Sequence, residues 1–260
     1  MKELRRLFID EVRLQNSCSK NELVQLNRKE SHYLNRVLRL KNNDAINVVD
    51  GCGNLWEAQL HQHDLLCLCS KFDSPLLKED RPKPLICLAV VIPKKGFEDI
   101  LRMSCEMGVD ILQPLISERR IFNNDKDYKF IRWHEILRQS VEQSERLWIP
   151  KLLKTVKIEN WLKNSFLSTS TSLATAMATT RRNNAMELQV WLSNLPERLD
   201  QVWVLIGPEG GWTNEEIDLS NKEGCSEVKF GEHILRTSTA SIAASQLMSS
   251  WRRIKTTSSN

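Results

Sequence analysis

A glycine-rich segment in the last quarter of the chain has the composition of a ligand-binding loop. Gly207-Pro208-Glu209-Gly210-Gly211 follows the apolar run VWVLI and precedes Thr213, which forms a capping box with Glu216 three residues later. This pattern predicts a buried strand, a tight turn and a helix. Glycines in the turn would let backbone N–H and C=O groups approach a ligand closely. A tight turn without a ligand is the competing interpretation.

The spacing of these glycines excludes two common nucleotide-binding motifs. No Gly-Lys-Ser/Thr follows the loop, so it is not a Walker A motif. The pattern is also not G-x-G-x-x-G, so a classical dinucleotide-binding fold is not supported.

A second segment, VKFGEHILRTSTA, places a cation beside another predicted strand-to-helix turn. A short strand is expected to end at Gly231, and Arg236 stands just before a helix start rich in Thr and Ser. Arg236 could instead cap that helix or pair with Glu232. Small and apolar residues then recur at helical spacing, at Ala240, Ala243, Ala244, Leu247, Met248 and Trp251. Two neighbouring strand ends with such loops would form a crevice for a small ligand.

The elements that must position these loops alternate between strands and helices. Strands are predicted at 85–92, a continuous apolar run, and at 111–116, and helices at 97–107 and 129–148. The uncharged stretch 168–180 has no clear period, so it predicts either a loop or no defined element. This order predicts an α/β fold with a mostly parallel sheet that binds ligands at the carboxyl ends of its strands.

The first 75 residues are predicted to be rich in β-structure. Two strand-like runs, 45–50 and 55–60, flank a turn signal, and 31–40 is expected to be a short helix that exposes His32, Arg36 and Arg39. The segment SPLLKEDRPKP, which combines three prolines with five charges, has the composition of a linker. We therefore expect domains at 1–75 and 85–260, joined by residues 76–84.

Positive charge is concentrated at the start of the chain. The 260 residues carry 37 Lys and Arg against 33 Asp and Glu, a formal charge of +4. Residues 1–41 have ten basic and five acidic residues, a charge of +5, so the remainder sums to −1. Such an excess suits a polyanion such as RNA, although a chance imbalance on a solvated surface is the alternative.

Composition also bounds the environment of the protein. The longest apolar run has eight residues, fewer than the ~20 that cross a bilayer, and no signal peptide is indicated. The seven scattered cysteines lack zinc-site spacing, which favours buried, reduced thiols and no metal. A soluble, cytoplasmic protein without a membrane partner is expected.

Several stretches resemble one known family. LIGPEGGWTNEEI and FGEHILRTSTA are similar to the two signature stretches of SPOUT-superfamily methyltransferases of the RsmE type, the 16S ribosomal RNA uridine-N3 methyltransferases. RRLFI, HYLNRVLRL, EDILRMSCEMGVDILQPLISER and SVEQSER match as well, so the resemblance covers nearly the whole chain in order.

The resemblance implies a PUA-like RNA-binding β-barrel at 1–75 and a SPOUT α/β domain at 85–260 that ends in a deep trefoil knot. It also implies a homodimer that uses S-adenosyl-L-methionine, held in the knot largely by backbone groups, and acts on 16S ribosomal RNA or the small ribosomal subunit. The implied cofactor-binding residues are Leu205, Gly207, Pro208, Glu209, Gly210, Gly211, Gly231, Ile234, Leu235 and Thr237. The implied RNA-binding residues are Arg6, Arg36, Arg39, Arg119 and Arg146.

The proposed chemistry makes Arg236 the catalytic candidate. Uridine N3 is a weak nucleophile until it loses its proton, so a cation near O2 or O4 or a general base is needed. Glu209 could balance the sulfonium charge of the cofactor or accept backbone N–H groups in its own loop. Because N3 lies on the Watson–Crick edge, the target base must be unpaired or flipped out.

Four residues depart from the family pattern. Ser238 replaces a usual glutamate, His233 a usual arginine, Glu145 a glycine and Met103 a lysine. No obvious general base remains, and solvent or His233 could serve. A catalytically weakened RNA-binding ribosome-assembly factor is therefore one alternative, and a metabolic α/β enzyme that uses a nucleotide is another.

Overall fold

The chain forms two compact units. The computed structural model describes residues 4–119, 126–163, 172–180, 182 and 185–257. The first unit comprises Met1–Arg81 together with Arg138–Ile149, and the second comprises Pro82–Leu137 and Pro150–Asn260. The boundaries 1–75, 76–84 and 85–260 stay a prediction, and the attachment of Arg138–Ile149 to the first unit was not predicted.

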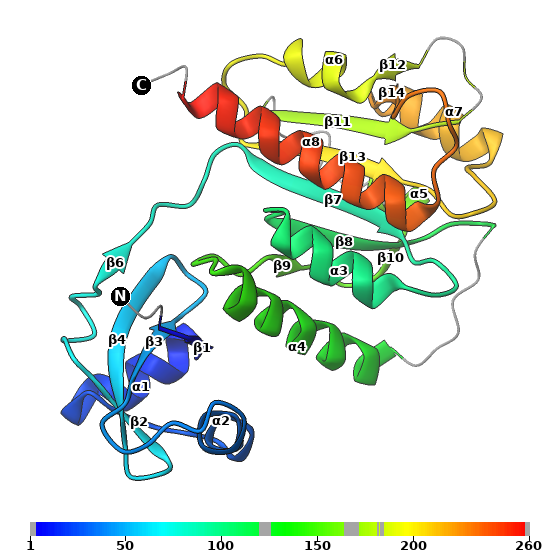
Figure 1. Ribbon diagram of the computed structural model, residues 1–260. Helices are drawn as coiled ribbons and strands as arrows, with labels where there is room; N and C mark the ends of the chain where they lie inside the picture. Colours follow the sequence, from blue (N-terminus) through cyan, green and yellow to red (C-terminus); the bar gives the residue numbers. More distant parts are fainter. Residues whose placement is uncertain (1–3, 120–125, 164–171, 181, 183–184, 258–260) are drawn as a thin grey trace. The chain divides into compact units, whose positions relative to one another are not determined.

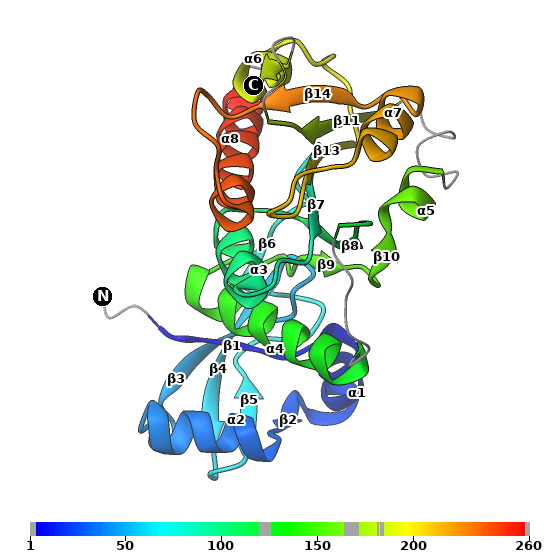
Figure 2. The same cartoon turned by 90° about the vertical axis from the view of Figure 1, so that its right-hand side faces the viewer.

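The first unit is built on a six-stranded sheet in the order β1-β3-β4-β5-β2, with β6 also paired to β4 (Figure 2). Among the described strands of this sheet, β1 and β3 pair in parallel and the other pairs are antiparallel. The strands are β1 (Arg6–Phe8), β2 (Leu23–Gln25), β3 (Ala45–Val49), β4 (Asn54–His61), β5 (Leu65–Leu68) and β6 (Leu77–Lys78). Helices α1 (Glu11–Asn21) and α2 (Arg28–His32) and the π-helical turn η1 (Tyr33–Val37) complete it.

Alternating side chains on these strands bury one apolar core. Trp56 on β4 is almost fully buried, stacks on Phe72 with 5.4 Å between ring centroids, and donates its indole N–H to the Phe72 carbonyl at 3.1 Å. The segment Arg138–Ile149 is attached by backbone hydrogen bonds from Ile149 N to Gly51 O and from Gly53 N to Leu147 O, both 3.0 Å. These bonds make it part of this unit.

The second unit is a wholly parallel sheet in the order β10-β8-β7-β13-β11-β14-β12, with β9 beside β8 (Figure 1). Its strands are β7 (Leu85–Val91), β8 (Ile111–Ile116), β9 (Lys151–Leu152), β10 (Val156–Lys157), β11 (Leu173–Ala178), β12 (Met186–Glu187), β13 (Gln201–Ile206) and β14 (Ser226–Lys229). The parallel sheet that the sequence predicts is therefore confirmed.

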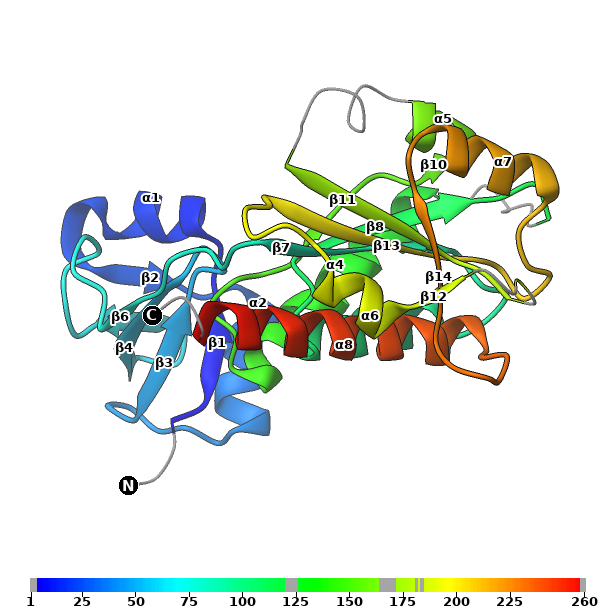
Figure 3. The same cartoon turned by 90° about the horizontal axis from the view of Figure 1, so that it is seen from above.

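Helices cover both faces of this sheet. Figure 3 shows α6 (Leu188–Ser193) and α8 (Thr237–Thr257) on one side and α5 (Ile158–Lys163) and α7 (Asn214–Lys222) on the other. Helix α3 (Phe97–Glu106) packs against α8, and α4 (Lys126–Ser144) follows the undescribed residues 120–125. No helix of the described residues is long and apolar enough to span a membrane.

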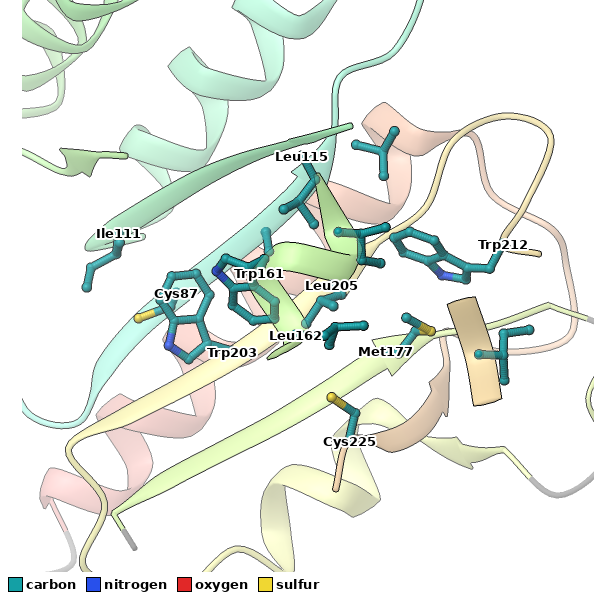
Figure 4. Packing of buried hydrophobic residues seen from close by; sticks show 14 residues of the cluster. Cys87, Ile111, Leu115, Trp161, Leu162, Met177, Trp203, Leu205, Trp212 and Cys225 are labelled. Carbon is teal, nitrogen blue, oxygen red and sulfur yellow. The ribbon is translucent and has the colours of Figure 1, made fainter. Parts of the chain in front are cut away.

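The central strands are buried on both faces, as their continuous apolar sequences predict. Trp203 on β13 is fully buried and meets Trp161 of α5 edge-on, with 5.3 Å between ring centroids. Cys87, Leu205 and Trp212 belong to the same cluster (Figure 4). This core fixes β13, whose carboxyl end carries the glycine-rich loop.

Some predicted elements were wrong. The stretch 168–180, expected to be a loop or to have no defined element, contains β11, which lies between β13 and β14, so the two loop-bearing strands are not neighbours. The predicted helix at 31–40 ends in a π-helical turn, and Arg39 lies beyond it with a left-handed φ of 56°.

Candidate functional site

A cavity of about 840 Å³ lies in the second unit at the carboxyl ends of β13, β11 and β14. Three segments line most of it: Gly207–Trp212 after β13, Thr179, Thr180 and Arg182 after β11, and Lys229–Thr237 at the end of β14. Sites for small molecules typically measure roughly 300–1,000 Å³. The cavity is therefore large enough for a cofactor with part of a substrate.

Side chains from other elements fix the glycine-rich loop. The Thr237 hydroxyl, at the start of α8, donates to Gly207 O at 2.9 Å, and the Trp212 indole donates to Ala178 O at 2.9 Å. Arg119 Nη1 donates to Gly210 O at 2.6 Å. The loop is thus tied to the segments that follow β8, β11 and β14.

Close packing explains a glycine at position 207. A Cβ atom there would lie 2.9 Å from the Trp212 ring, a distance that real Cβ contacts essentially never show. Gly231 has a φ of +105°, which residues with a side chain rarely adopt. The first loop therefore needs glycine at 207 because of the Trp212 ring, and the second needs it at 231 because of the backbone conformation.

The capping box does more than begin α7. The buried Glu216 carboxylate accepts the Thr213 N–H through Oε2 at 2.9 Å, and the Glu118 N–H through Oε1 at 3.1 Å. It thereby joins the helix start to the segment that carries Arg119. Its exposed neighbour Glu215 has a lowered pKa because its own backbone N–H, and then the Thr213 hydroxyl, stabilise the carboxylate.

The loop after β14 offers unused backbone groups to a ligand. Residues 231–235 form no hydrogen bond with the described part of the chain. Thr179 adds a side-chain group, because its hydroxyl is buried without a hydrogen-bond partner among the described residues. A buried polar group left unpaired costs about 1–3 kcal/mol, which a bound ligand would recover.

The charges around the cavity are not equivalent. Lys229 lies 3.7 Å from Glu187 and Arg182 lies 3.8 Å from Glu227, so both have acidic partners. Arg236 is exposed at the cavity wall; its carbonyl accepts the Ala240 N–H at 2.8 Å, but its guanidinium forms no ion pair or hydrogen bond with the described residues. The pairing with Glu232 considered from the sequence is not formed, which leaves this guanidinium available to a substrate.

Comparison with known proteins decides the family. The RNA methyltransferase domain matches residues 79–249, and the RNA methyltransferase PUA domain matches residues 26–62. The chain is 36% identical to the ribosomal RNA small subunit methyltransferase E of Synechocystis over 85% of this chain and 71% of that protein. The chain belongs to the ribosomal RNA small subunit methyltransferase E family. The PUA-like first unit and the α/β second unit agree with this assignment.

The chain spans a larger share of the length of two other similar proteins. It is 30% identical to the methyltransferase E of Buchnera aphidicola subsp. Schizaphis graminum over 86% of this chain and 89% of that protein. The crystal structure of methyltransferase E from Neisseria gonorrhoeae, bound to S-adenosyl methionine, is 27% identical, with a TM-score of 0.77 and coverage of 95% of this chain and 98% of that chain.

Most of the predicted cofactor residues of this methyltransferase E family member lie together at the cavity. Gly207–Gly211, Gly231, Ile234, Leu235 and Thr237 all line it, as does the catalytic candidate Arg236. Leu205 instead lies in the buried core, and its neighbour Ile206 lines the cavity. Thr179 and Trp212 also line the cavity but were not among the predicted residues; Thr179 follows β11, a strand that the sequence does not mark clearly.

The predicted RNA-binding arginines are divided between the units. Arg119 lines the cavity, whereas Arg36 and Arg39 are exposed on the first unit. Arg6 is 15% exposed and pairs with Glu145 at 3.0 Å, and Arg146 is half-buried in the segment that joins the first unit. An RNA role for Arg6 would require a phosphate to compete with Glu145, and all five roles stay predictions.

Proposed function

We propose that this chain transfers the methyl group of S-adenosyl-L-methionine to N3 of a uridine in 16S ribosomal RNA. The observation that carries the proposal is the cavity that the glycine-rich loop and the loop after β14 form together, in a member of the methyltransferase E family. The Neisseria relative bound to S-adenosyl methionine supports the choice of cofactor.

The residues present fit this cofactor. The unbonded peptide groups of 231–235 and the unpaired Thr179 hydroxyl provide donors and acceptors for the polar groups of a nucleoside and an amino acid. The bound cofactor supplies an electrophilic methyl group on a sulfonium. Glu209 lines the cavity with a carboxylate that also accepts the Lys94 N–H at 3.2 Å, so it can offset positive charge from a fixed position.

Arg236 would favour the nucleophilic form of the substrate. A uracil that loses its N3 proton places negative charge on O2 and O4, and a guanidinium beside either oxygen stabilises that charge. The proton goes to solvent or to His233, which lines the same cavity, since Ser238 stands where the family usually has glutamate.

Recognition of the RNA would involve the first unit. A base that reacts at its Watson–Crick edge must be unpaired, so the enzyme has to recognise RNA outside the regular helix. The PUA match and the +5 charge of residues 1–41 support an RNA-binding role for this unit.

The finer parts of the proposal are a homodimer, a trefoil knot and a cytoplasmic location beside the ribosomal subunit. Exposed apolar side chains at Met186, Val190 and Ile254 support an interface on the second unit. Membership of the methyltransferase E family supports the trefoil knot. The alternative of an inactive assembly factor is not favoured, since the relatives are named as methyltransferases and both loops are intact.

The test uses small ribosomal subunits from a strain that lacks its own methyltransferase E. The wild-type protein and S-adenosyl-L-methionine should add one N3-methyluridine, detected by mass spectrometry of the digested RNA. Arg236→Ala should slow transfer by about 100-fold, as does loss of one charge-stabilising donor, with cofactor affinity by calorimetry changed only a few-fold.

Arg253→Ala is the matched control, because Arg253 is exposed on α8 and does not line the cavity. Unchanged turnover in Arg236→Ala would remove Arg236 from the mechanism. Absence of methyluridine with the wild-type protein would refute the function itself.

A further inference from the structure

A second hollow, of about 640 Å³, lies wholly within the first unit. Its walls come from the β2–α2 junction, from α2 and η1, and from the turn between β4 and β5. Its lining includes Leu26, Arg28, His32, Asn35, Arg36, Leu40, His63 and Asp64. None of them lines the cavity of the second unit.

One wall presents a histidine in a fixed orientation. The side-chain amide of Asn35 donates from Nδ2 to Ser31 O at 2.8 Å and to His63 O at 2.6 Å. Its Oδ1 therefore faces His63 Nδ1, 3.1 Å away, and accepts a hydrogen bond from it. In a neutral imidazole this places the proton on Nδ1 and leaves Nε2 as an acceptor. The ring is thus held by a network and keeps a free polar edge.

The rim of this hollow carries unpaired positive charge. The guanidinium groups of Arg28 and Arg36 are exposed and form no hydrogen bond or ion pair with the described residues, and the exposed side chain of His32 lines the same hollow. Asp64 is the one acidic residue in the lining, and its carboxylate accepts the Gln25 amide at 3.1 Å.

Two other arginines of this unit, in contrast, have carboxylate partners. Arg13 binds Glu30 through both terminal nitrogens, at 2.6 and 2.7 Å, and Arg6 pairs with Glu145. Arg28 and Arg36 therefore stand out as guanidinium groups held at a hollow without a carboxylate partner.

The hollow has more room than a phosphate alone would fill, and part of its lining is apolar. Buried Leu26 and half-buried Leu40 contribute apolar side chains to the lining that also contains His63. Unstacked bases bind to apolar surfaces and to the faces of His and Arg side chains, while Arg groups bind phosphate. Apolar surface, a fixed imidazole and two open guanidinium groups in one hollow match the parts of a nucleotide.

We propose that this hollow binds one unpaired nucleotide of the substrate RNA, with Arg28 and Arg36 at its phosphates and His63 and Leu40 at its base. The inference rests on the proposed function in that the ligand is RNA. It adds a nucleotide-binding site in the first unit, with Arg28 and His63 as contact residues.

The first measurement is the affinity of the full-length protein for a single-stranded ribo-oligonucleotide, by fluorescence anisotropy without cofactor at several salt concentrations. The double variant Arg28→Gln/Arg36→Gln should bind about tenfold or more weakly. The slope of log affinity against log salt should fall by about 1.4, because each phosphate contact to a single strand contributes about 0.7.

The matched control is Lys29→Gln/Lys71→Gln, which removes the same charge from exposed positions of the first unit outside the hollow. An equal loss of affinity in both double variants would show a general charge effect and overturn the proposal. An unchanged urea concentration for alkylation of Cys67, which lies in the first unit, would show that this unit is folded in the variants.

A second measurement tests the base. The wild type should prefer the ribo-oligonucleotide to an abasic strand of equal length, and His63→Ala should lose that preference. Equal binding of both strands by the wild type would exclude a base site. Methylation by the wild type distinguishes the two proposals: if methyluridine forms but the variants bind RNA normally, only the nucleotide site is wrong.

Discussion

Glu145 shows how a single residue of this chain departs from its family and is accommodated. It follows the last residue of α4 with a φ of 60°, in the left-handed region that favours glycine, and the family usually has glycine there. Its carboxylate pairs with Arg6 at 3.0 Å, and its carbonyl also accepts a hydrogen bond from Arg6. The ion pair therefore offsets part of the cost of a side chain in this conformation.

Two substitutions separate these effects. Glu145→Ala removes the ion pair and keeps the strained backbone, whereas Glu145→Gly removes both. Since the left-handed conformation costs residues with a Cβ about 1–2 kcal/mol, the glycine variant should be more stable than the alanine variant by about 1 kcal/mol. Urea unfolding measures the difference, and an alanine variant that equals or exceeds the glycine variant would contradict this explanation.

At the scale of elements, Glu216 acts as a bridge. One carboxylate oxygen accepts an N–H group at the start of α7, and the other accepts an N–H group from the segment after β8. That segment contains Arg119, whose guanidinium donates to Gly210 O in the glycine-rich loop. We infer that Glu216 is a positioning residue for the glycine-rich loop.

Glu216→Gln tests this role, because an amide has one acceptor oxygen for two N–H donors. One buried N–H then loses its partner, which costs about 1–3 kcal/mol and loosens the loop. The KM for S-adenosyl-L-methionine should rise about tenfold.

Glu215→Gln is the matched control, with the same charge change in the same helical turn on an exposed side chain. It should leave the KM unchanged. A normal KM in Glu216→Gln would mean that the bridge does not position the loop.

Elements were predictable where local spacing encodes them. The glycines, Thr213 and Glu216 fix a turn and a helix start within ten residues, and the structure has both. Strand β11, LATAMA, contains mostly alanine and threonine. It lacks the valine and isoleucine residues that mark β7 and β13 as strands in the sequence. Its place between β13 and β14, and with it the contribution of Thr179, depends on pairing over long sequence distances.

For the whole molecule, the cysteines report on each unit separately. Six of the seven have described side chains: Cys52, Cys67 and Cys69 in the first unit, and Cys87, Cys105 and Cys225 in the second. The expectation of buried thiols is right for the second unit and wrong for Cys69, which is exposed. Burial raises the pKa of Cys225 to about 12, so its thiol stays neutral and unreactive at pH 8.

Cysteine alkylation in increasing urea should therefore follow the two units independently. At pH 8, Cys69 should react in the folded protein, while Cys87, Cys105 and Cys225 should react together only when the second unit unfolds. Raising the pH to 9 should not make Cys225 react in the folded protein, because pH 9 is still well below the raised pKa of its thiol.

Cofactor should shift only one set of these cysteines. A ligand that binds the folded second unit at 100 times its Kd stabilises it by about 2.7 kcal/mol, so Cys87, Cys105 and Cys225 should need more urea to react. The half-buried Cys67 should react at the same urea concentration with and without cofactor, because no residue of its unit lines the cavity. Mass spectrometry of the alkylated peptides measures both sets, and an equal shift of Cys67 would show that the two units unfold together.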